Sequence, residues 1–437
     1  MTLEFLTNKR ILILGFGREG QDSFLFLRRH FPEKTIGIAD QTEFQNLSEA
    51  TRKLLEKDKH VVLYFGDDYL SSIYLYEVVI KSPGIPLHEV QPFVSKTQQL
   101  TSQTNIFFDL CPGRIIGVTG TKGKSTTSSL LYEVLKQGGF QAHLVGNIGV
   151  PVFQALEKAT KKDVFIYELS SYQLELLRKS PHIAILLNLY EEHLDHYGSM
   201  KSYVEAKSHI AKFQTDKDYL VYNRSNQLVR AIAKKSKAKK IAYEYAIRAD
   251  APFIAALEPV IEVGKLLKIS QAKIQKAIRQ FKPLPHRLEF VGTYREIKFY
   301  NDSLATIPEA AMAAISSLGS NVHTLIAGGF DRGVSMKKFA EYLLASPVRV
   351  LILFPITGIS LWDEMQKLAD RQTSTQLPEH VIVQTMDQAV QESYARTLSG
   401  NICLLSPAAS SFNLFRDYQD RGEQFKKFVK FYGKKKS

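Results

Sequence analysis

Residues 114–127 read RIIGVTGTKGKSTT, and this stretch fixes the kind of fold in which it can occur. Arg114–Gly120 is an apolar run that predicts a buried strand, and Thr127–Gln137 has the spacing of a helix. The glycine-rich turn between them exposes successive backbone N–H groups at the positive end of that helix, which is a ready anion site. We therefore expect a phosphate-binding loop made of Gly120, Thr121, Lys122, Gly123, Lys124, Ser125, Thr126 and Thr127.

Two side chains of this loop have the chemistry of a nucleotide site. Lys124 can reach the β- and γ-phosphates of ATP, and the Ser125 hydroxyl can ligate Mg²⁺. The strict phosphate-loop pattern needs glycine six positions before the lysine, where this chain has Val118, so the loop is a shortened variant. A surface turn rich in glycine, lysine and serine is the competing interpretation, and the flanking strand and helix disfavour it.

Acidic and basic side chains follow the next apolar strands. Glu168 ends the run Val164–Tyr167, and a carboxylate at the carboxyl end of a parallel strand beside a phosphate loop can hold Mg²⁺. It can equally be a helix-capping residue. Downstream, residues 188–197 (NLYEEHLDHY) and 202–207 (SYVEAK) cluster carboxylates, histidines and a lysine, which fits metal ligation or a polar rim.

A second glycine loop lies near the N-terminus. The strand Arg10–Gly15 leads into Gly15-x-Gly17-x-x-Gly20, and Asp40 follows at the spacing of ~20 residues that suits the ribose of a dinucleotide. The motif alone is compatible with an NAD-dependent dehydrogenase, but that function leaves the phosphate loop at 120–127 unexplained.

Bulk properties exclude several classes of protein. A chain of 437 residues with 44% hydrophobic content fits about two to four soluble domains. Its apolar runs are shorter than the ~18 residues of a membrane span. The two cysteines, Cys111 and Cys403, lack metal-ligand spacing, so we expect a cytoplasmic protein.

The formal net charge of +13 leaves open nucleic-acid binding, attraction of an anionic substrate, or a simple excess of lysine. Part of the excess lies in the runs 234–240 and 434–437, which are more typical of a solvated face and a frayed end. No nucleic-acid-binding module accompanies them.

Strand-like runs alternate with helical segments almost throughout, which predicts α/β layers with mainly parallel sheets. Three blocks stand out, and we expect domain boundaries near residues 100 and 285, giving domains 1–100, 101–285 and 286–437.

Eight motifs in order resemble the Mur ligase family across nearly the whole chain. They are the shortened phosphate loop, GNIGVP (146–151), ELSSYQLE (168–175), EHLDHY (192–197), PHRLEFVG (285–292), NDSLAT (301–306), GGFDRG (328–333) and LSPAASSF (405–412). The resemblance implies a Rossmann-like N-terminal domain, a central P-loop ATPase domain and a Rossmann-like C-terminal domain.

The resemblance also implies a reaction. The family joins a carboxylate to an amine with ATP through an acyl phosphate, using two Mg²⁺ ions and no protein nucleophile. KSPGIP (81–86), GGFDRG and LSPAASSFNLF look like the member that adds glutamate, expected to be D-glutamate, to UDP-N-acetylmuramoyl-L-alanine in peptidoglycan precursor synthesis. A monomer is expected.

By similarity to the family, residues of all three domains receive expected roles. Lys124, Ser125 and Glu168 would serve ATP and a first Mg²⁺, and His193 with a carbamylated Lys207 would hold a second. The expected nucleotide contacts from the C-terminal domain are His286, Arg287 and Asp302. The UDP-sugar contacts would be Gly17, Arg18, Glu19, Asp40, Ser82 and Asn147, and the glutamate contacts Thr306, Arg332, Ser411, Phe412 and Tyr418.

The chain departs from the family pattern at several places. Glu192 replaces an aspartate, Arg332 replaces the acceptor-site lysine, and Leu304 and Ile307 replace a lysine and an asparagine. The stretch between Lys207 and His286 is short, and residues 249–256 lack the expected adenine-contacting pattern. Two alternatives therefore stay open: a ligase of the same superfamily with another acceptor or acyl substrate, such as a folate, or a nucleotide-binding protein without turnover.

Overall fold

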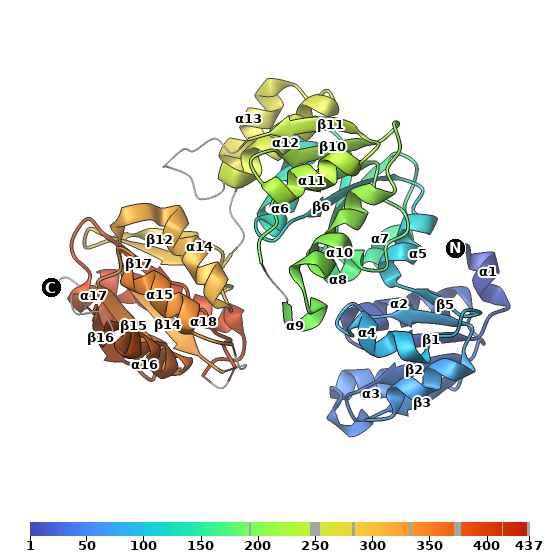
Figure 1. The fold of residues 1–437 in the computed structure, drawn as a ribbon, viewed down its shortest axis with the longest axis horizontal. Helices are drawn as coiled ribbons and strands as arrows, with labels where there is room; N and C mark the ends of the chain where they lie inside the picture. Colours follow the sequence, from blue (N-terminus) through green and yellow to red (C-terminus); the bar gives the residue numbers. More distant parts are fainter. Residues whose placement is uncertain are drawn as a thin grey trace. The chain divides into compact units, whose positions relative to one another are not determined.

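The structure is a computed structural model that describes residues 1–191, 194–244, 254–281, 285–331, 334–370, 377–412 and 414–434. It contains three sheets flanked by helices, which confirms the predicted α/β class (Figure 1). The chain forms two compact units, of which one carries the first two sheets and the other carries the third.

The first sheet has five parallel strands in the order β3-β2-β1-β4-β5. Its central strand, β1, is fully buried because parallel neighbours lie on both sides of it, which explains the uninterrupted apolar sequence ILIL. The strands are β1 (Ile11–Leu14), β2 (Ile36–Asp40), β3 (Val61–Phe65), β4 (Val78–Lys81) and β5 (Gln99–Thr101). The helices are α1 (Leu3–Thr7), α2 (Arg18–His30), η1 (Phe44–Asn46), α3 (Glu49–Glu56), η2 (Tyr69–Leu75), α4 (Leu87–Val90) and η3 (Gln91–Phe93).

The second sheet has six parallel strands in the order β11-β10-β9-β6-β8-β7. The strands are β6 (Arg114–Thr119), β7 (Gln141–Gly146), β8 (Asp163–Glu168), β9 (Ile183–Leu186), β10 (Tyr219–Asn223) and β11 (Lys239–Tyr243). The helices are α5 (Gln103–Leu110), α6 (Lys124–Gly138), α7 (Val152–Leu156), α8 (Ser171–Leu174), α9 (Leu194–Tyr197), α10 (Met200–Lys212), α11 (Gln227–Lys235), α12 (Ile254–Leu266) and α13 (Gln271–Gln280). Because β6 lies between β9 and β8, the loops that leave these three strands meet at one edge of the sheet.

A shared apolar core joins the first two sheets. It runs from β1 and α2 through α5 to β8 and α10, and Phe26 of α2 stacks on Phe153 of α7 with ring centroids 4.1 Å apart. This core fixes the loops of the first sheet relative to those of the second.

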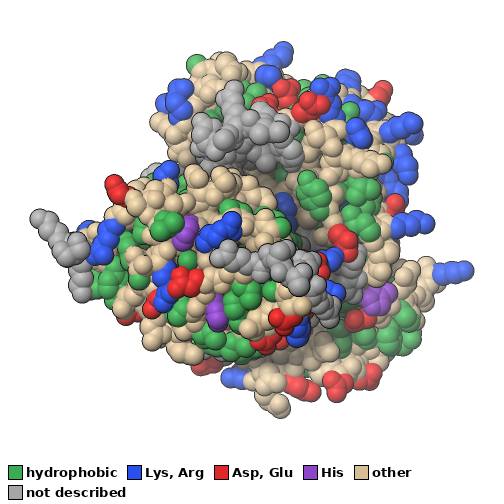
Figure 2. Space-filling model, turned by 60° about the vertical axis from the view of Figure 1, so that its left-hand side comes forward, with side chains coloured by type: hydrophobic (Ala, Val, Ile, Leu, Met, Phe, Trp, Pro, Cys, Tyr) green, Lys and Arg blue, Asp and Glu red, His purple; other side chains and the backbone are tan. Residues whose placement is uncertain are grey.

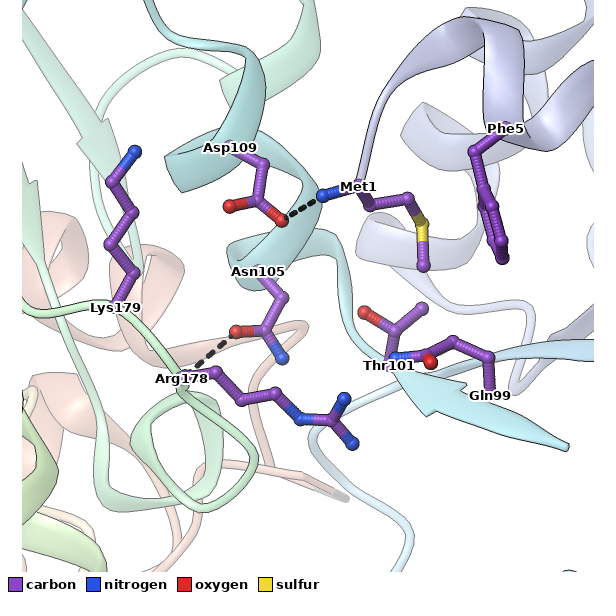
Figure 3. Close-up of a pocket in the computed structure, with 8 residues that line it drawn as sticks. All are labelled: Met1, Phe5, Gln99, Thr101, Asn105, Asp109, Arg178 and Lys179. Carbon is purple, nitrogen blue, oxygen red and sulfur yellow. Dashed lines mark hydrogen bonds and ion pairs between the residues drawn. The ribbon is translucent and has the colours of Figure 1, made fainter. Parts of the chain in front are cut away.

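Polar contacts around a cavity of about 280 Å³ reinforce the same junction (Figure 3). Asn105 of α5 accepts a hydrogen bond from the Arg178 backbone at 3.0 Å and donates one to the Leu176 carbonyl at 2.6 Å. The Arg178 guanidinium donates to the Leu100 carbonyl of β5 at 3.2 Å. The side chains around this cavity therefore help to join β5 and α5 to the segment that contains Leu176 and Arg178.

The third sheet belongs to the other unit and has the order β12-β13-β17-β14-β15-β16. Only the β12–β13 pair in it is antiparallel. The strands are β12 (Glu289–Tyr294), β13 (Ile297–Asn301), β14 (Val322–Gly329), β15 (Val350–Ile356), β16 (Glu379–Ile382) and β17 (Ile402–Leu405). The helices are α14 (Pro308–Leu318), η4 (Gly319–Asn321), α15 (Lys337–Leu344), α16 (Thr357–Ala369), α17 (Met386–Arg396) and α18 (Tyr418–Lys434).

The basic run 234–240 behaves as a solvated face. All five of its lysines are exposed, and the two residues between them, Ser236 and Ala238, are buried. On the face of the molecule in view, lysines and arginines are scattered with acidic side chains between many of them (Figure 2). Among the described residues, no helix is both long and apolar enough to cross a membrane. The domain boundaries near 100 and 285 stay a prediction.

The core behind the phosphate loop gives a first test of stability. Leu131 of α6 is fully buried, so we expect Leu131→Ala to lower the free energy of unfolding by about 2–5 kcal/mol, because it leaves a cavity. The half-exposed Leu75 of η2 supplies the control, and Leu75→Ala should change the free energy of unfolding by less than about 1 kcal/mol. Urea unfolding followed by circular dichroism measures both, and equal losses for the two variants would contradict the packing described.

Candidate active site

The phosphate loop lies at the C-terminal end of β6, where the sequence predicts it. Its residues 120–123 form the turn, and Lys124–Thr127 form the first turn of α6. Gly123 is the N-cap residue with φ of 87°, in the left-handed region that glycine adopts without strain. A residue with a side chain would be strained there, so the sequence needs glycine at this point.

Contacts from the segment after β9 hold the loop in place. The Thr121 backbone N–H donates to the Asn188 carbonyl at 2.7 Å, and the Lys122 N–H donates to Asn188 Oδ1 at 2.8 Å. Asn188 Nδ2 returns a bond to the Lys122 carbonyl at 3.0 Å. The Lys124 ammonium donates to the carbonyls of Gly120 and Thr121 at 2.9 and 3.0 Å, so it lies over the turn.

Glu168 ends β8 next to this loop and is fully buried. Its Oε1 accepts hydrogen bonds from Ser125 Oγ at 3.2 Å and from Asn147 Nδ2 at 3.1 Å. Its Oε2 is buried and makes no hydrogen bond to the described residues. An unpartnered buried carboxylate oxygen beside a serine hydroxyl is a set of hard oxygen donors, which fits Mg²⁺.

Lys207 of α10 also contacts the phosphate loop. The Lys207 side chain is buried, and its Nζ donates to Thr119 Oγ1 at 3.1 Å and to the Gly120 carbonyl at 3.0 Å. The structure therefore brings Lys207 to the phosphate loop, whereas its carbamylation stays a prediction. His193, expected beside it at a second Mg²⁺, lies outside the described residues, as do Glu192 and positions 249–253 of the altered segment.

The glycine loop of the first sheet is packed as tightly as its sequence suggests. A Cβ at Gly20 would lie 2.1 Å from the Gly15 carbonyl, so glycine is required for α2 to approach β1. Asp40 accepts from the backbone N–H groups of Phe16 at 2.6 Å and Thr42 at 2.8 Å. Ser82 Oγ donates to the Gly15 carbonyl at 2.8 Å. Asp40 and Ser82 thus lie at this loop and help to shape it.

Gly17 caps the start of α2, and Arg18 and Glu19 in its first turn contact segments that flank the second sheet. Arg18 Nη2 donates to the Gly149 carbonyl at 2.9 Å, and Gly17 is the exposed N-cap residue of the helix. A cavity of about 180 Å³ lies at this point. Arg18, Glu19, Asp22, Gln103, Gly146, Asn147, Pro151 and Val152 line it. The structure therefore unites three predicted substrate residues, Arg18, Glu19 and Asn147, that are far apart in sequence.

Glu19 has an unusual environment for a carboxylate. Its Oε1 accepts from Gln173 Nε2 at 2.7 Å, and its Oε2 is buried without a hydrogen-bond partner among the described residues. Burial raises the pKa of Glu19 to about 7, with a smaller contribution from the nearby Asp22, while the Gln173 hydrogen bond opposes the rise. Glu19 therefore changes charge near neutral pH.

The C-terminal unit places its predicted nucleotide residues at two points, with His286 and Arg287 before β12 and Asp302 after β13. Asp302 accepts from Ser406 Oγ at 2.8 Å and from the Leu288 backbone at 3.1 Å. His286 is buried with φ of 63°, and its Nδ1 lies 3.0 Å from Asn301 Nδ2. Burial lowers the pKa of His286, and Lys426 lowers it further. Arg287 has a buried Nη1 without a hydrogen-bond partner among the described residues.

The predicted acceptor residues lie on loops of the same unit. Ser411 is buried and Phe412 is half exposed, both after β17, and the neighbouring Ser410 bridges Phe330 after β14. Tyr418 begins α18 with its ring edge-on to His286, at a centroid distance of 6.1 Å. Thr306 is half-buried before α14. Arg332 lies outside the described residues, so its expected contact with the acceptor stays a prediction.

Several residues at these sites carry no assignment from the sequence. Asn188 braces the phosphate loop, Gln173 contacts Glu19, and Asp22 and Gln103 line the cavity. Asn188 and Gln173 lie inside motifs that the sequence displays, so their position was a usable signal. Asp22 and Gln103 have none, because only the packing of α2 against α5 brings them together.

Comparison with known proteins finds relatives over nearly the whole chain. Residues 118–278 match the Mur ligase middle domain, and residues 286–409 match the family described as "Mur ligase, glutamate ligase domain". The UDP-N-acetylmuramoylalanine–D-glutamate ligase of Ligilactobacillus salivarius is 31% identical over 457 residues, covering 97% of this chain and 96% of that protein. The enzyme of the same name from Acetivibrio thermocellus is 29% identical over 465 residues, covering 97% of each chain.

Solved structures show the same fold at lower identity. The MurF ligase of Thermotoga maritima in complex with ADP aligns with a TM-score of 0.57 at 13% identity, covering 97% of this chain and 95% of that one. A pseudomurein peptide ligase type C from Methanothermus fervidus aligns with a TM-score of 0.56 at 14% identity, covering 97% and 100%.

The unpartnered oxygen of Glu168 predicts a metal dependence. Glu168→Gln keeps an oxygen for Ser125 and Asn147 but removes the charge, so we expect it to weaken the apparent affinity for Mg²⁺ in the presence of ATP at least about tenfold. Calorimetric titration with Mg²⁺ at fixed ATP measures this change. Glu205→Gln, on the exposed face of α10, should leave it unchanged, and an unaltered Mg²⁺ affinity in Glu168→Gln would rule out Glu168 as a ligand.

Glu19 predicts a pH dependence of stability. Its pKa is raised from 4.5 to about 7 in the folded state, so folded protein binds the proton more tightly than unfolded protein does. This stabilisation is fully present below pH 4.5 and is lost as the pH rises through about 7, a change of about 3 kcal/mol. Chemical unfolding at pH 5 and pH 8 should show a smaller decline in Glu19→Gln than in the wild type. The exposed Glu56→Gln is the control, and it should decline as the wild type does.

Proposed function

The chain belongs to the Mur ligase family, and from that membership we propose how its residues catalyse the joining of D-glutamate to UDP-N-acetylmuramoyl-L-alanine with ATP. The assignment of substrates rests on the similarity of this chain to the two D-glutamate ligases over nearly the full length of each. The observation that carries the chemistry is the cluster of Ser125, Glu168 and Asn147 beside the phosphate loop, since it supplies cation ligands where ATP phosphates would bind.

The reaction needs two steps because a carboxylate is a poor acyl donor. A carboxylate oxygen of the alanyl group attacks the γ-phosphorus of ATP, the bond to the bridging oxygen breaks, and ADP leaves. The amine of D-glutamate then attacks the carbonyl carbon of the acyl phosphate. The tetrahedral intermediate expels inorganic phosphate, and the nitrogen loses its proton. The protein's contribution is to position the reactants and to offset charge.

Residues of the central sheet serve the phosphates. The backbone N–H groups at the start of α6 and the ammonium of Lys124 would face the β- and γ-phosphates, and the hydrogen bonds from Asn188 hold the shape of the loop. Ser125 and Glu168 would hold a first Mg²⁺, and His193 with carbamylated Lys207 a second. When bound, the two cations reduce the repulsion between ATP and the substrate carboxylate.

Residues of the first sheet would hold the UDP-sugar. The N-terminal end of α2, at Gly17, Arg18 and Glu19, suits the diphosphate, with Asp40 toward the uridine and Ser82 nearby. Asn147 supports this arrangement, because one side of it lines the cavity with Arg18 while its amide bonds Glu168. Substrate and metal sites are thereby linked by one side chain.

The C-terminal unit would supply further ligand contacts. His286, Arg287 and Asp302 would contact the nucleotide, with Asp302 near the ribose. Thr306, Arg332, Ser411, Phe412 and Tyr418 would hold the acceptor glutamate. The support is that the described members of both sets lie within one unit, just before β12, on the loops following β13 and β17, or at the start of α18. A monomeric, cytoplasmic enzyme stays a prediction.

Phosphate release tests the proposed function. Purified protein with ATP, Mg²⁺ and UDP-N-acetylmuramoyl-L-alanine should release phosphate when D-glutamate is added, and far less with L-glutamate or with no acceptor. The amide product should accumulate in equal amount. Dependence on another amino acid would keep the chemistry and change the acceptor, as Arg332 and Leu304 leave open. Binding of both nucleotides without any product would identify a binding protein instead.

A further inference from the structure

Arg421 of α18 is the largest side chain that is fully buried in the described part of the protein. Its guanidinium makes three hydrogen bonds. Nε donates to Ser303 Oγ at 3.0 Å, Nη2 to the Ser303 carbonyl at 2.9 Å, and Nη1 to the Ala409 carbonyl at 3.1 Å. A planar, forked cation is thus fixed at three points on two separate chain segments.

Those two segments are the ones that carry the residues proposed for the nucleotide and the acceptor. Ser303 directly follows Asp302 after β13, and Ala409 precedes Ser411 and Phe412 after β17. A third segment lies alongside, since a Cβ at Gly329 after β14 would be 3.5 Å from Arg421 Nη1 and 2.4 Å from the Ser410 carbonyl. Arg421 therefore lies behind the loops of three adjacent strands.

The charge of Arg421 has an unusual setting. Its three partners are neutral oxygens, and burial lowers the pKa of the guanidinium to about 9, which still leaves it protonated at neutral pH. Burying a cation whose described hydrogen-bond partners are all neutral costs desolvation free energy that no opposite charge among those partners offsets. ATP, the acyl phosphate and glutamate are all anionic, so the charge lies where their binding would offset it.

We propose that Arg421 is a positioning residue of the ligase reaction, which fixes the nucleotide-bearing and acceptor-bearing loops relative to each other and favours anionic ligands between them. This inference rests on the proposed function. Because Arg421 contacts both loops, its loss affects ATP and glutamate together. The UDP-sugar, held by the first sheet in the other unit, is unaffected.

Steady-state kinetics of full-length Arg421→Lys test the proposal. The lysine keeps the charge, but its single ammonium group cannot reproduce the guanidinium hydrogen bonds to both Ser303 and Ala409. We expect KM for ATP and KM for D-glutamate each to rise at least about tenfold, with a fall in kcat, because the loops shift against each other. KM for UDP-N-acetylmuramoyl-L-alanine should not change. Ser303→Ala, which removes one of the three bonds, should give the same pattern with smaller changes.

The control is Arg416→Lys, at an exposed position shortly before α18 where the arginine pairs with Asp420, and it should behave as the wild type. Unchanged constants in Arg421→Lys and Ser303→Ala would overturn the proposal. So would a lowered melting temperature with normal KM values for the folded enzyme, or a rise in all three KM values together, since both describe a merely structural arginine. If the wild type makes no amide product, the proposed function fails first and this inference fails with it.

Discussion

The hydrogen bonds between the phosphate loop and Asn188 are the contacts on which the site depends. A turn that presents several N–H groups to one point has no internal partners for them, so its shape has to be held from outside. Asn188 does this with its backbone and with both ends of its amide. The buried strands β6, β8 and β9 in turn fix Asn188, Glu168 and the start of α6 at one edge of the sheet.

Buried charged side chains occur in both units, and each one has a different environment. Glu168 keeps one carboxylate oxygen bonded to Ser125 and Asn147, and its other oxygen is buried without a hydrogen-bond partner among the described residues. Glu19 moves its pKa toward neutrality. Arg421 is surrounded by neutral oxygens of two loops. Such groups cost stability in an isolated protein, so their presence fits a chain whose ligands are themselves highly charged.

The sequence predicts the fold class and the phosphate loop well because both depend on local patterns. The strand–turn–helix at 114–138 is written in consecutive residues, and Gly123 is required by its own backbone. Contacts across the fold are different in kind. Asn188 meets Lys122 across 66 positions and Arg421 meets Ser303 across 118, and nothing adjacent to either residue reports the pairing. Spacing could place Glu168 near the loop, but only packing shows that its second oxygen lacks a partner.

The hydrogen bond between Gln173 and Glu19 restricts which substitutions the two positions can accept during evolution. Its oxygen accepts the Ser170 backbone N–H, so its nitrogen has to face Glu19, and an amide cannot exchange these roles without breaking one bond. Replacement by glutamate would set two carboxyl groups against each other, and replacement of Glu19 by a basic residue would oppose two donors. Mutations at either position are therefore tolerated mainly when the other changes as well. Positions 19 and 173 are expected to covary among relatives, although 154 residues separate them.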